Sequence, residues 1–517
     1  MKFIQGHNRT QINLFPVSLD QSIDPDNEVR IIDLFVESLS IKDYGFRTDF
    51  PENGRPAYHP SDLLKLFIYG YMNKVRSTRD LEKECKRNIE VMWLLKGLKP
   101  DHNTISNFRR DNPKAIKKVF RATVKIAKHF DLIGGKLIAG DSTKLRAQNS
   151  KKNNYNKAKI DRHIAYIDNK LEEYTMALAE NDGDNRQQIE DEIDKQQKRK
   201  DNYRNLEKQL KESGEPQISI SDPESRQIML RNNITEVAYN VQSTVDSKYN
   251  IPIDYKVTNQ NDSKAMGNMV QRTKSILGTN EFTVLYDKGF HTGSELKIAQ
   301  DLGVETIVAI PKLPSTSQAP NHEYNYEYFR HDPLTDTYTC PQGEILRTNG
   351  SWYKELTSSG NVIMFKQYKT RACKSCQVRS ECTRSKTARL IHRSEFAEYY
   401  EANRINTLEK EQLYRRRQAI VEHPYGTIKR QWGFSYILTK KGRERASSDV
   451  GLMFIAYNLR RILNILTRDQ LKEYLRVLLS LFLAIFDLIG INLREYDVFN
   501  YPEPLIVRKY NTSFNLT

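Results

Sequence analysis

The chain contains 517 residues, which is long enough for about three domains, each with its own core. Hydrophobic residues make up 38% and charged residues 28%, a composition typical of a soluble protein and not of a membrane protein. Lys and Arg outnumber Asp and Glu by 81 to 65, and this net charge of +16 favours a polyanionic partner, nucleic acid first and an anionic membrane second. A charge surplus that serves only solubility is the alternative.

The N-terminal segment lacks the continuous apolar stretch of a signal peptide, so we expect a cytoplasmic protein. Residues up to about 135 show helical periodicity: Ser61 caps one helix, and a second runs from Ser77 to Gly97. A turn at Pro100 then leads into a short polar helix. This outline predicts a helix-turn-helix, although plain helical bundles share it. The predicted DNA contacts are Ser106, Asn107, Arg109 and Arg110.

A short apolar strand, 136–139, is predicted to end on Asp141 and opens a section of mixed helices and strands. A charged insertion at 152–214 follows. Its apolar residues recur at alternating steps of four and three from Ile160 to Leu178, which is a heptad seam. The insertion is therefore predicted to be an antiparallel helical hairpin, an appendage without a site of its own.

Strands resume in a hairpin around the turn DSKYN, and a later apolar strand ends on Asp287. Asp141 and Asp287 thus share one setting, the carboxyl end of a strand, where sites assemble in α/β sheets. Carboxylates held there can bind Mg²⁺ or Mn²⁺ for phosphoryl displacement. Each acid taken alone is also a common turn residue.

Four of the five cysteines lie in a second insertion, at 320–388, which interrupts the α/β section. A CxxC pair with flanking cysteines is the spacing of a structural zinc site, and the rest of the insertion is predicted to be rich in strands. Reduced cysteines without metal are the alternative. The four residues are Cys340, Cys373, Cys376 and Cys382, whereas Cys85 fits a helical core.

The segment Arg415 to Gly433 carries one acid, Glu422, among many Arg and Lys residues. A third carboxylate from a late helix would complete a metal site, and scissile phosphates against it would require basic neighbours. Lys429 lies two helical turns after Glu422 and shares its face if the helix continues. Pro424 predicts a kink or a restart there. An ordinary surface acid is the alternative.

The apolar run Val477 to Gly490 contains Asp487 and is too short to span a bilayer. It is predicted to be a buried C-terminal helix. No membrane partner is expected.

Three blocks carry a family resemblance: IAGDSTKLRA, VLYDKGFHTGSEL and VEHPYGTIKRQWGF, in that order. They resemble the three blocks of bacterial insertion-sequence DDE transposases of the cut-and-paste type. The segments RTQINLFPVSLDQSIDPDNEVRIIDLFVESL and HPSDLLKLFIYGYMNKVRSTRDLE resemble the helical DNA-binding domain of that group, and the cysteine-bearing insertion resembles one of its branches.

The resemblance implies a mixed α/β and α+β chain with a ribonuclease-H-like catalytic core. The implied domains are a helical DNA-binding domain (1–134), a catalytic domain (135–466) with helical-hairpin and zinc-ribbon-like insertions, and a C-terminal helix and tail (467–517). Asp141, Asp287 and Glu422 would be the catalytic metal ligands. Lys288 lies beside Asp287 and is a candidate DNA contact. Lys429 fits the Lys of the family's last block, whereas Tyr414 and Arg417 each lie one residue further from Glu422 than the usual spacing.

The predicted function is metal-dependent cleavage at the ends of a mobile element, followed by strand transfer into target DNA. The partners would be terminal inverted repeats, target DNA and a second copy of the chain in a synaptic complex associated with the nucleoid. Two alternatives are a ribonuclease-H-like nuclease or recombination enzyme, and a non-catalytic DNA-binding regulator descended from a transposase.

Overall fold

The computed structural model describes residues 18–49, 56–180, 186–229, 234–312, 318–356, 362–439 and 441–488, with side chains to 480. The chain forms two compact units. One consists of Met1–Leu66, Cys85–Lys99 and Leu466–Thr517, and the other of Phe67–Glu84 and Pro100–Ile465. Among the described residues, no helix is long and apolar enough to cross a membrane.

The first unit is helical. Its elements are η1 (Asp20–Ser22), α1 (Glu28–Glu37), the start of α2 (Pro60–Met72), α4 (Ile89–Leu94) and α15 (Arg468–Leu488). The buried Lys65 ammonium forms ion pairs with Asp33, at 2.7 Å, and with Glu37. The predicted C-terminal helix exists, but Val477 is 49% exposed, so the apolar run is not buried throughout. Residues 489 and 490 of the run lie outside the described part.

The predicted single helix from Ser77 to Gly97 is wrong. The structure has α3 (Thr78–Arg87) and then α4, because the Asn88 side chain accepts hydrogen bonds from the amides of Glu90 (3.0 Å) and Val91 (3.3 Å) and thereby starts a new helix. The polar helix of the predicted helix-turn-helix is α5 (His102–Asp111), which is followed by α6 (Pro113–His129).

The second unit is built on a six-stranded sheet. Its strands are β1 (Leu137–Arg146), β4 (Arg226–Met229), β5 (Thr235–Asp246), β6 (Ile251–Thr258), β7 (Thr283–Tyr286) and β8 (Glu305–Val308). The order is β4-β5-β1-β7-β8, and β6 pairs with a separate stretch of β5. β1, β7 and β8 are parallel to one another, whereas β5 is antiparallel to β1 and to β6. The predicted hairpin around DSKYN is therefore β5 and β6.

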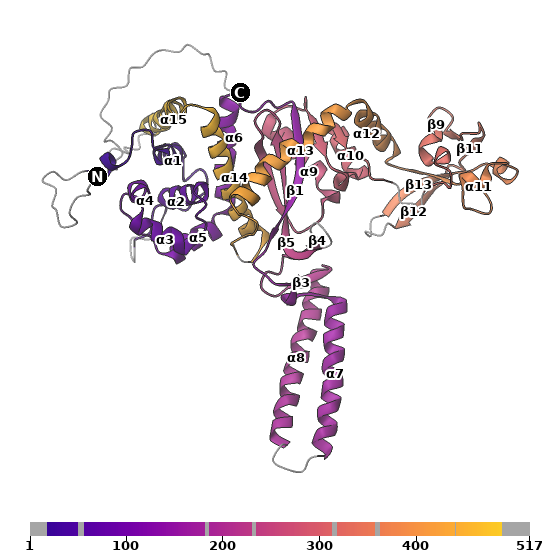
Figure 1. Cartoon of the computed structure of the whole chain (residues 1–517), viewed down its shortest axis with the longest axis horizontal. Helices are drawn as coiled ribbons and strands as arrows, with labels where there is room; N and C mark the ends of the chain where they lie inside the picture. The colour runs from indigo at the N-terminus through magenta and orange to yellow at the C-terminus, as the bar shows by residue number, and fades with distance from the viewer. Residues whose placement is uncertain are drawn as a thin grey trace, which may run out of the picture. The chain divides into compact units, whose positions relative to one another are not determined.

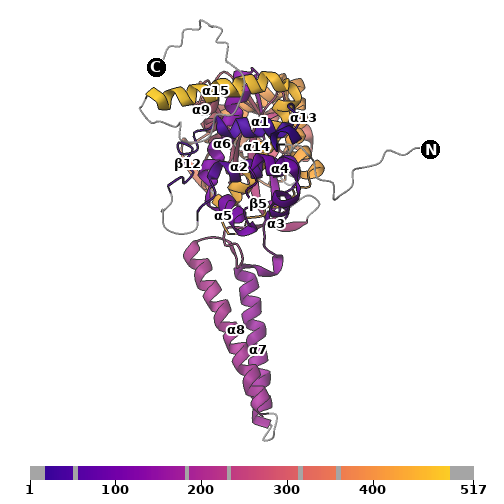
Figure 2. The ribbon, with the colours of Figure 1, turned by 90° about the vertical axis from the view of Figure 1, so that its left-hand side faces the viewer.

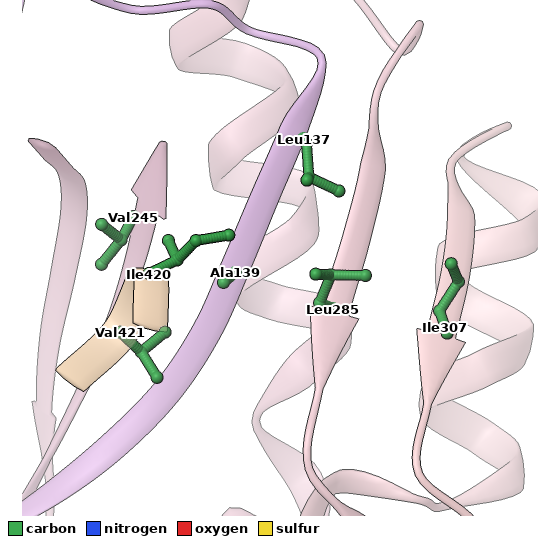
Figure 3. Close-up of a cluster of buried hydrophobic side chains, with 7 residues drawn as sticks. All are labelled: Leu137, Ala139, Val245, Leu285, Ile307, Ile420 and Val421. Atoms are coloured by element: carbon green, nitrogen blue, oxygen red, sulfur yellow. The ribbon is translucent and has the colours of Figure 1, made fainter. Parts of the chain in front are cut away.

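Helices pack on this sheet. They are α9 (Met266–Leu277), α10 (Gly293–Asp301), α12 (Ala397–Glu409), α13 (Glu411–Gly426) and α14 (Arg443–Ile465), with short turns η4 (Asp262–Lys264) and η5 (Lys288–Phe290). α6 and α14 pack on each other and on β6, while α13 contacts β1, β5 and β7. Figure 3 shows Ile420 and Val421 of α13 beside the sheet residues Ala139 and Val245. This apolar contact fixes the position of α13 on the strands that carry the predicted acids.

The insertion after β1 is a helical hairpin, as the heptad seam predicts. Short pieces η2 (Lys151–Asn153), β2 (Asn154–Asn156) and β3 (Gln217–Ser219) flank the long helices α7 (Lys157–Glu180) and α8 (Arg186–Ser213). Ile160 and Ile167 of the seam are fully buried. The two helices lie side by side in Figures 1 and 2.

The cysteine-bearing insertion folds into two small antiparallel sheets, ordered β11-β10-β9 and β12-β13-β14. Its core consists of Phe329, Tyr338, Leu346, Tyr368 and Ile391. The elements are η6 (His322–Tyr324), η7 (Tyr326–Tyr328), β9 (Arg330–Asp332), β10 (Thr337–Thr339), β11 (Ile345–Arg347), β12 (Trp352–Leu356), β13 (Val362–Tyr368), η8 (Arg371–Lys374), α11 (Arg379–Cys382) and β14 (Ile391–Ser394).

Candidate active site

Asp141 and Asp287 occupy equivalent places on adjacent parallel strands. The register of β1 with β7 pairs Ile138 with Val284 and Ala139 with Leu285, so two residues further on Asp141 is level with Asp287. Neighbouring strands are about 4.8 Å apart, so Asp141 and Asp287 are carried by backbones separated by about that distance. The sequence-based prediction that the strand ends on Asp141 is wrong. β1 continues to Arg146 because β5 pairs with it as far as that residue, and only the pairing with β7 stops before Asp141.

Gly140 allows this close approach. A Cβ atom at Gly140 would lie 2.0 Å from the Tyr286 ring, so no larger residue fits while that ring stays in place. Tyr286 is fully buried, and burial raises the pKa of its phenol, with Asp141 among the smaller contributors. Each acid thus directly follows one member of a tightly packed pair, Gly140 and Tyr286.

Asp287 is held by its own turn, since its Oδ1 accepts a hydrogen bond from the Gly289 amide at 2.8 Å. Asp141 is held from α13: Arg417 Nη1 donates to Asp141 Oδ2 at 3.2 Å. Burial raises the pKa of the Asp141 carboxyl above its usual value, the Arg417 charge opposes that rise, and the charge of Asp287 adds to it. The charge of Asp287 therefore works against ionisation of Asp141, and the charge of Arg417 works in favour of it.

Glu422 lies on the same helix as Arg417, but its side chain is exposed and accepts a hydrogen bond from Gln418 Nε2 at 2.9 Å. Among the described residues, no three His, Cys, Asp or Glu side chains are grouped so that they could hold a metal ion. The side chains as they stand therefore bring Asp141 and Asp287 together without drawing Glu422 into a three-ligand group.

The predicted restart after Glu422 does not occur, because Pro424 lies inside α13. The helix changes to a π-helical turn, η9 (Thr427–Gln431), directly after α13. Lys429 on this turn reaches β1, where its ammonium donates to Thr143 Oγ1 at 2.9 Å. Sequence reasoning missed Tyr425, whose hydroxyl contacts the Asp141 carbonyl at 3.2 Å and Ser243 Oγ at 2.7 Å. Its place in the block HPYG, three residues after Glu422, was the available signal.

Two other candidates lie close to the acids. Tyr414 is half-buried on α13; burial raises the pKa of its phenol, and the nearby Arg417 charge lowers it. Lys288 follows Asp287 directly and is exposed.

On α5, the predicted base contact by Arg109 is not compatible with its position. The side chain is 4% exposed, and its Nη1 donates to the Tyr71 hydroxyl at 3.0 Å and to the Arg76 carbonyl at 3.1 Å. Arg109 is therefore a buried structural residue. Ser106 is half-buried, whereas Asn107 and Arg110 are exposed, with Arg110 bound to Asp111 at 2.6 Å.

The four clustered cysteines are free thiols that line one small cavity of about 30 Å³, together with apolar residues such as Phe329 and Leu346. Burial raises the pKa of the Cys382 thiol, and the other three cysteines add smaller increases. Cys85 is fully buried, as expected.

Two protein families match the chain. Residues 17–111 match a transposase domain, DUF772, and residues 339–463 match a transposase DDE domain, which includes Glu422 and Lys429. Both matches support a DDE transposase, which is an enzyme that cleaves DNA and transfers strands. Neither alternative, a nuclease without strand transfer or a non-catalytic regulator, is favoured.

No curated protein matches this transposase. A solved structure, a piggyBac transposase synaptic complex with hairpin DNA, is similar over 93% of this chain and 86% of that chain, with 10% identity and a TM-score of 0.29. A score this low does not establish a shared fold.

Proposed function

We propose that this transposase acts at the ends of its own mobile element, and that Asp141, Asp287 and Glu422 form its catalytic centre. The observation that carries the proposal is the pair Asp141 and Asp287, level with each other on adjacent parallel strands below the helix that bears Glu422. The strand order, with β1, β7 and β8 parallel and β5 and β6 antiparallel, supports a ribonuclease-H-like core. Residues 135–466 would be the catalytic domain, and 1–134 the DNA-binding domain, with 467–517 as a C-terminal extension.

The donor set suits a divalent cation such as Mg²⁺ or Mn²⁺, because two carboxylates carried by adjacent strands supply hard oxygen ligands, and DDE transposases generally use such ions. Asp141 and Asp287 would hold the ion, and Glu422 would join them by turning its side chain from Gln418. The ion would supply charge stabilisation at the scissile phosphate. Arg417, which already neutralises Asp141, would then be free to contact a phosphate oxygen.

Basic and polar residues around the acids would hold the DNA backbone. Lys429 and Lys288 would provide the positive charge, and Tyr414 lies beside Arg417. On α5, the candidates for reading the terminal inverted repeats are Asn107, Ser106 and Arg110. Arg109 is excluded as a base contact because its side chain is buried. Cleavage at both ends and transfer into target DNA would be carried out by two copies of the chain in the cytoplasm, at the nucleoid.

The cysteine-bearing insertion would be stabilised by a structural zinc ion. Cys340, Cys373, Cys376 and Cys382 line the same cavity as free thiols, which is the donor chemistry that zinc prefers. The thiols would have to move closer, since the described side chains include no group of three arranged to hold an ion. Such a small domain, with few core residues, gains stability from a metal.

Replacing Asp287 by Asn tests the catalytic assignment. The substitution keeps the size of the side chain and removes its charge, so it should abolish Mn²⁺-dependent cleavage of a supercoiled plasmid that carries the DNA flanking the gene, while DNA binding persists. Glu281→Gln, which removes a charge from an exposed side chain six residues earlier, is the matched control and should cleave normally. Cleavage by Asp287→Asn at the control rate would disprove the assignment.

A further inference from the structure

The backbone pairing of β1 with β7 ends before it reaches the two acids. Its last pair is Ala139 with Leu285, two residues before Asp141 and Asp287. Beyond that point β1 goes on pairing with β5, whereas β7 gives way to the η5 turn. The pairing of these two strands therefore does not by itself hold the acids at a fixed separation, and contacts between side chains must contribute.

Asp262, in the short turn η4, lies between the two segments that carry the acids. Its Oδ2 accepts a hydrogen bond from Lys144 Nζ of β1 at 2.9 Å, and the two side chains form an ion pair. η4 also packs against η5. A Cβ atom at Gly289 of η5 would lie 3.9 Å from Asp262 Cβ. One aspartate thus binds β1 and adjoins the turn that follows Asp287.

Each of these contacts leads to one of the acids. On β1, Lys144 Nζ also donates to Ser142 Oγ at 2.8 Å, and the Ser142 amide donates to Asp141 Oδ1 at 2.7 Å. On η5, the Gly289 amide donates to Asp287 Oδ1 at 2.8 Å. The two carboxylates are therefore connected through one set of contacts that has η4 at its centre.

The carboxylate of Asp262 is itself fully engaged. Its Oδ1 accepts a hydrogen bond from Asn240 Nδ2 at 2.7 Å, while its Oδ2 accepts from Lys144. Lys144 lies opposite Asn240 in the register of β1 with β5, three residues after Asp141. Because side chains alternate along a strand, Lys144 and Asp141 point to opposite faces of the sheet. Asp262 can therefore hold the strand from behind without binding an ion at the acids.

We propose that Asp262 is a positioning residue for DNA cleavage, and that its ion pair with Lys144 keeps Asp141 and Asp287 at the separation at which they share a divalent cation. The inference rests on the proposed function, since it takes these two acids as metal ligands. Groups that orient metal ligands without touching the metal change metal affinity or activity about 10- to 100-fold when they are removed. The pair is partly exposed, so it contributes little to the stability of the fold. Its loss should therefore affect metal binding more than unfolding.

The test measures Mn²⁺ binding to the full chain, from the electron paramagnetic resonance signal of free Mn²⁺. Asp262→Asn and Lys144→Met should each weaken binding about 10-fold. The double variant should bind Mn²⁺ no more weakly than either single variant, because both substitutions break the same ion pair. Asp168→Asn is the matched control: it breaks an ion pair with Lys200, at 2.6 Å in the α7–α8 hairpin, and should leave Mn²⁺ binding unchanged.

Two results would overturn the inference and leave the proposed function intact. One is normal Mn²⁺ binding by Asp262→Asn when Asp287→Asn has lost it. The other is tighter binding by Lys144→Met together with weaker binding by Asp262→Asn, which would make Asp262 a metal ligand that competes with a lysine. Absence of Mn²⁺ binding by the unmodified chain, or normal binding by Asp287→Asn, would overturn the proposed function as well. Thermal unfolding of both single variants should change little, and a large loss of stability in both would make the pair purely structural and refute the inference.

Discussion

Replacing Gly140 by Ala should inactivate the transposase although no charge changes and no proposed ligand is removed. The added Cβ would lie 2.0 Å from one carbon of the Tyr286 ring and 2.4 Å from its hydroxyl oxygen, well inside van der Waals contact. Tyr286 is fully buried, so its ring cannot move out to solvent. The strain must be relieved by shifting β1 against β7, and those two strands carry Asp141 and Asp287 directly after the clash.

The size of the effect follows from packing and from geometry. Adding one methyl group to a well-packed core costs about 1–3 kcal/mol of stability, which a chain of this size tolerates. A displacement of about 1 Å at reacting groups can reduce the rate about 100-fold. We therefore expect a folded protein with a slightly lower melting temperature, normal DNA binding and at least about 100-fold slower cleavage.

The measurement is Mn²⁺-dependent nicking of a supercoiled plasmid carrying the flanking DNA, with thermal unfolding in parallel. The double variant Gly140→Ala with Tyr286→Leu provides the decisive comparison, because the shorter side chain makes room for the methyl group. It should recover part of the lost rate relative to Gly140→Ala alone. If Gly140→Ala cleaves normally, or if the double variant is no better than the single one, the packing of Gly140 on Tyr286 does not position the acids.

Three further predictions address stability, pH and metal. Asp449→Asn leaves the Arg76 guanidinium, 2.8 Å away, without its buried counter-charge, and should lower the free energy of unfolding by about 3–5 kcal/mol. Asp26→Asn, which breaks an exposed ion pair with Arg468, is the control and should lower it by under about 1 kcal/mol. Burial raises the pKa of the Asp141 carboxyl, so the folded state favours its protonated form. The free energy of unfolding should therefore fall as pH rises from the ordinary aspartate pKa through the raised pKa of Asp141. Mn²⁺ binding should strengthen over that same rise, and a pH-independent affinity would contradict this. Purified protein should contain one zinc ion per chain, which Cys373→Ser should remove and Cys85→Ser, in the helical core, should not.

Much of the fold was predictable because the local patterns agree with it. The heptad seam gave the α7–α8 hairpin, and the turn DSKYN gave the pairing of β5 with β6. The length of β1 was not predictable, because its second half is polar in sequence and is a strand only through pairing with β5, a partner about 100 residues away. The break at Asn88 was missed because a cap inside an apolar periodic stretch looks like an ordinary helical residue.

The residues of the candidate site were likewise only partly predictable from the sequence. Acids after short apolar strands could be found from sequence, since parallel strands bring their carboxyl ends to one edge. The burial of Arg109 could not, because it depends on Tyr71 and on the charge of Asp449, which lies 340 residues further along the chain. An Arg on a polar helix next to an exposed Asn gives no local sign that it faces the interior.

The spacing around Glu422 explains why α13 presents Arg417 and Glu422 differently. Each residue of an α-helix turns about 100°, so Arg417, five residues before Glu422, projects about 140° away from it, whereas a residue four positions before projects only about 40° away. The residue at that closer position is Gln418, and it is the one that donates to the Glu422 carboxylate, at 2.9 Å. Arg417 is turned instead toward β1 and Asp141. We therefore propose that the extra residue separates two tasks on this helix: Arg417 balances the charge of Asp141, and Gln418 holds Glu422 at the exposed surface, where a DNA backbone can reach it.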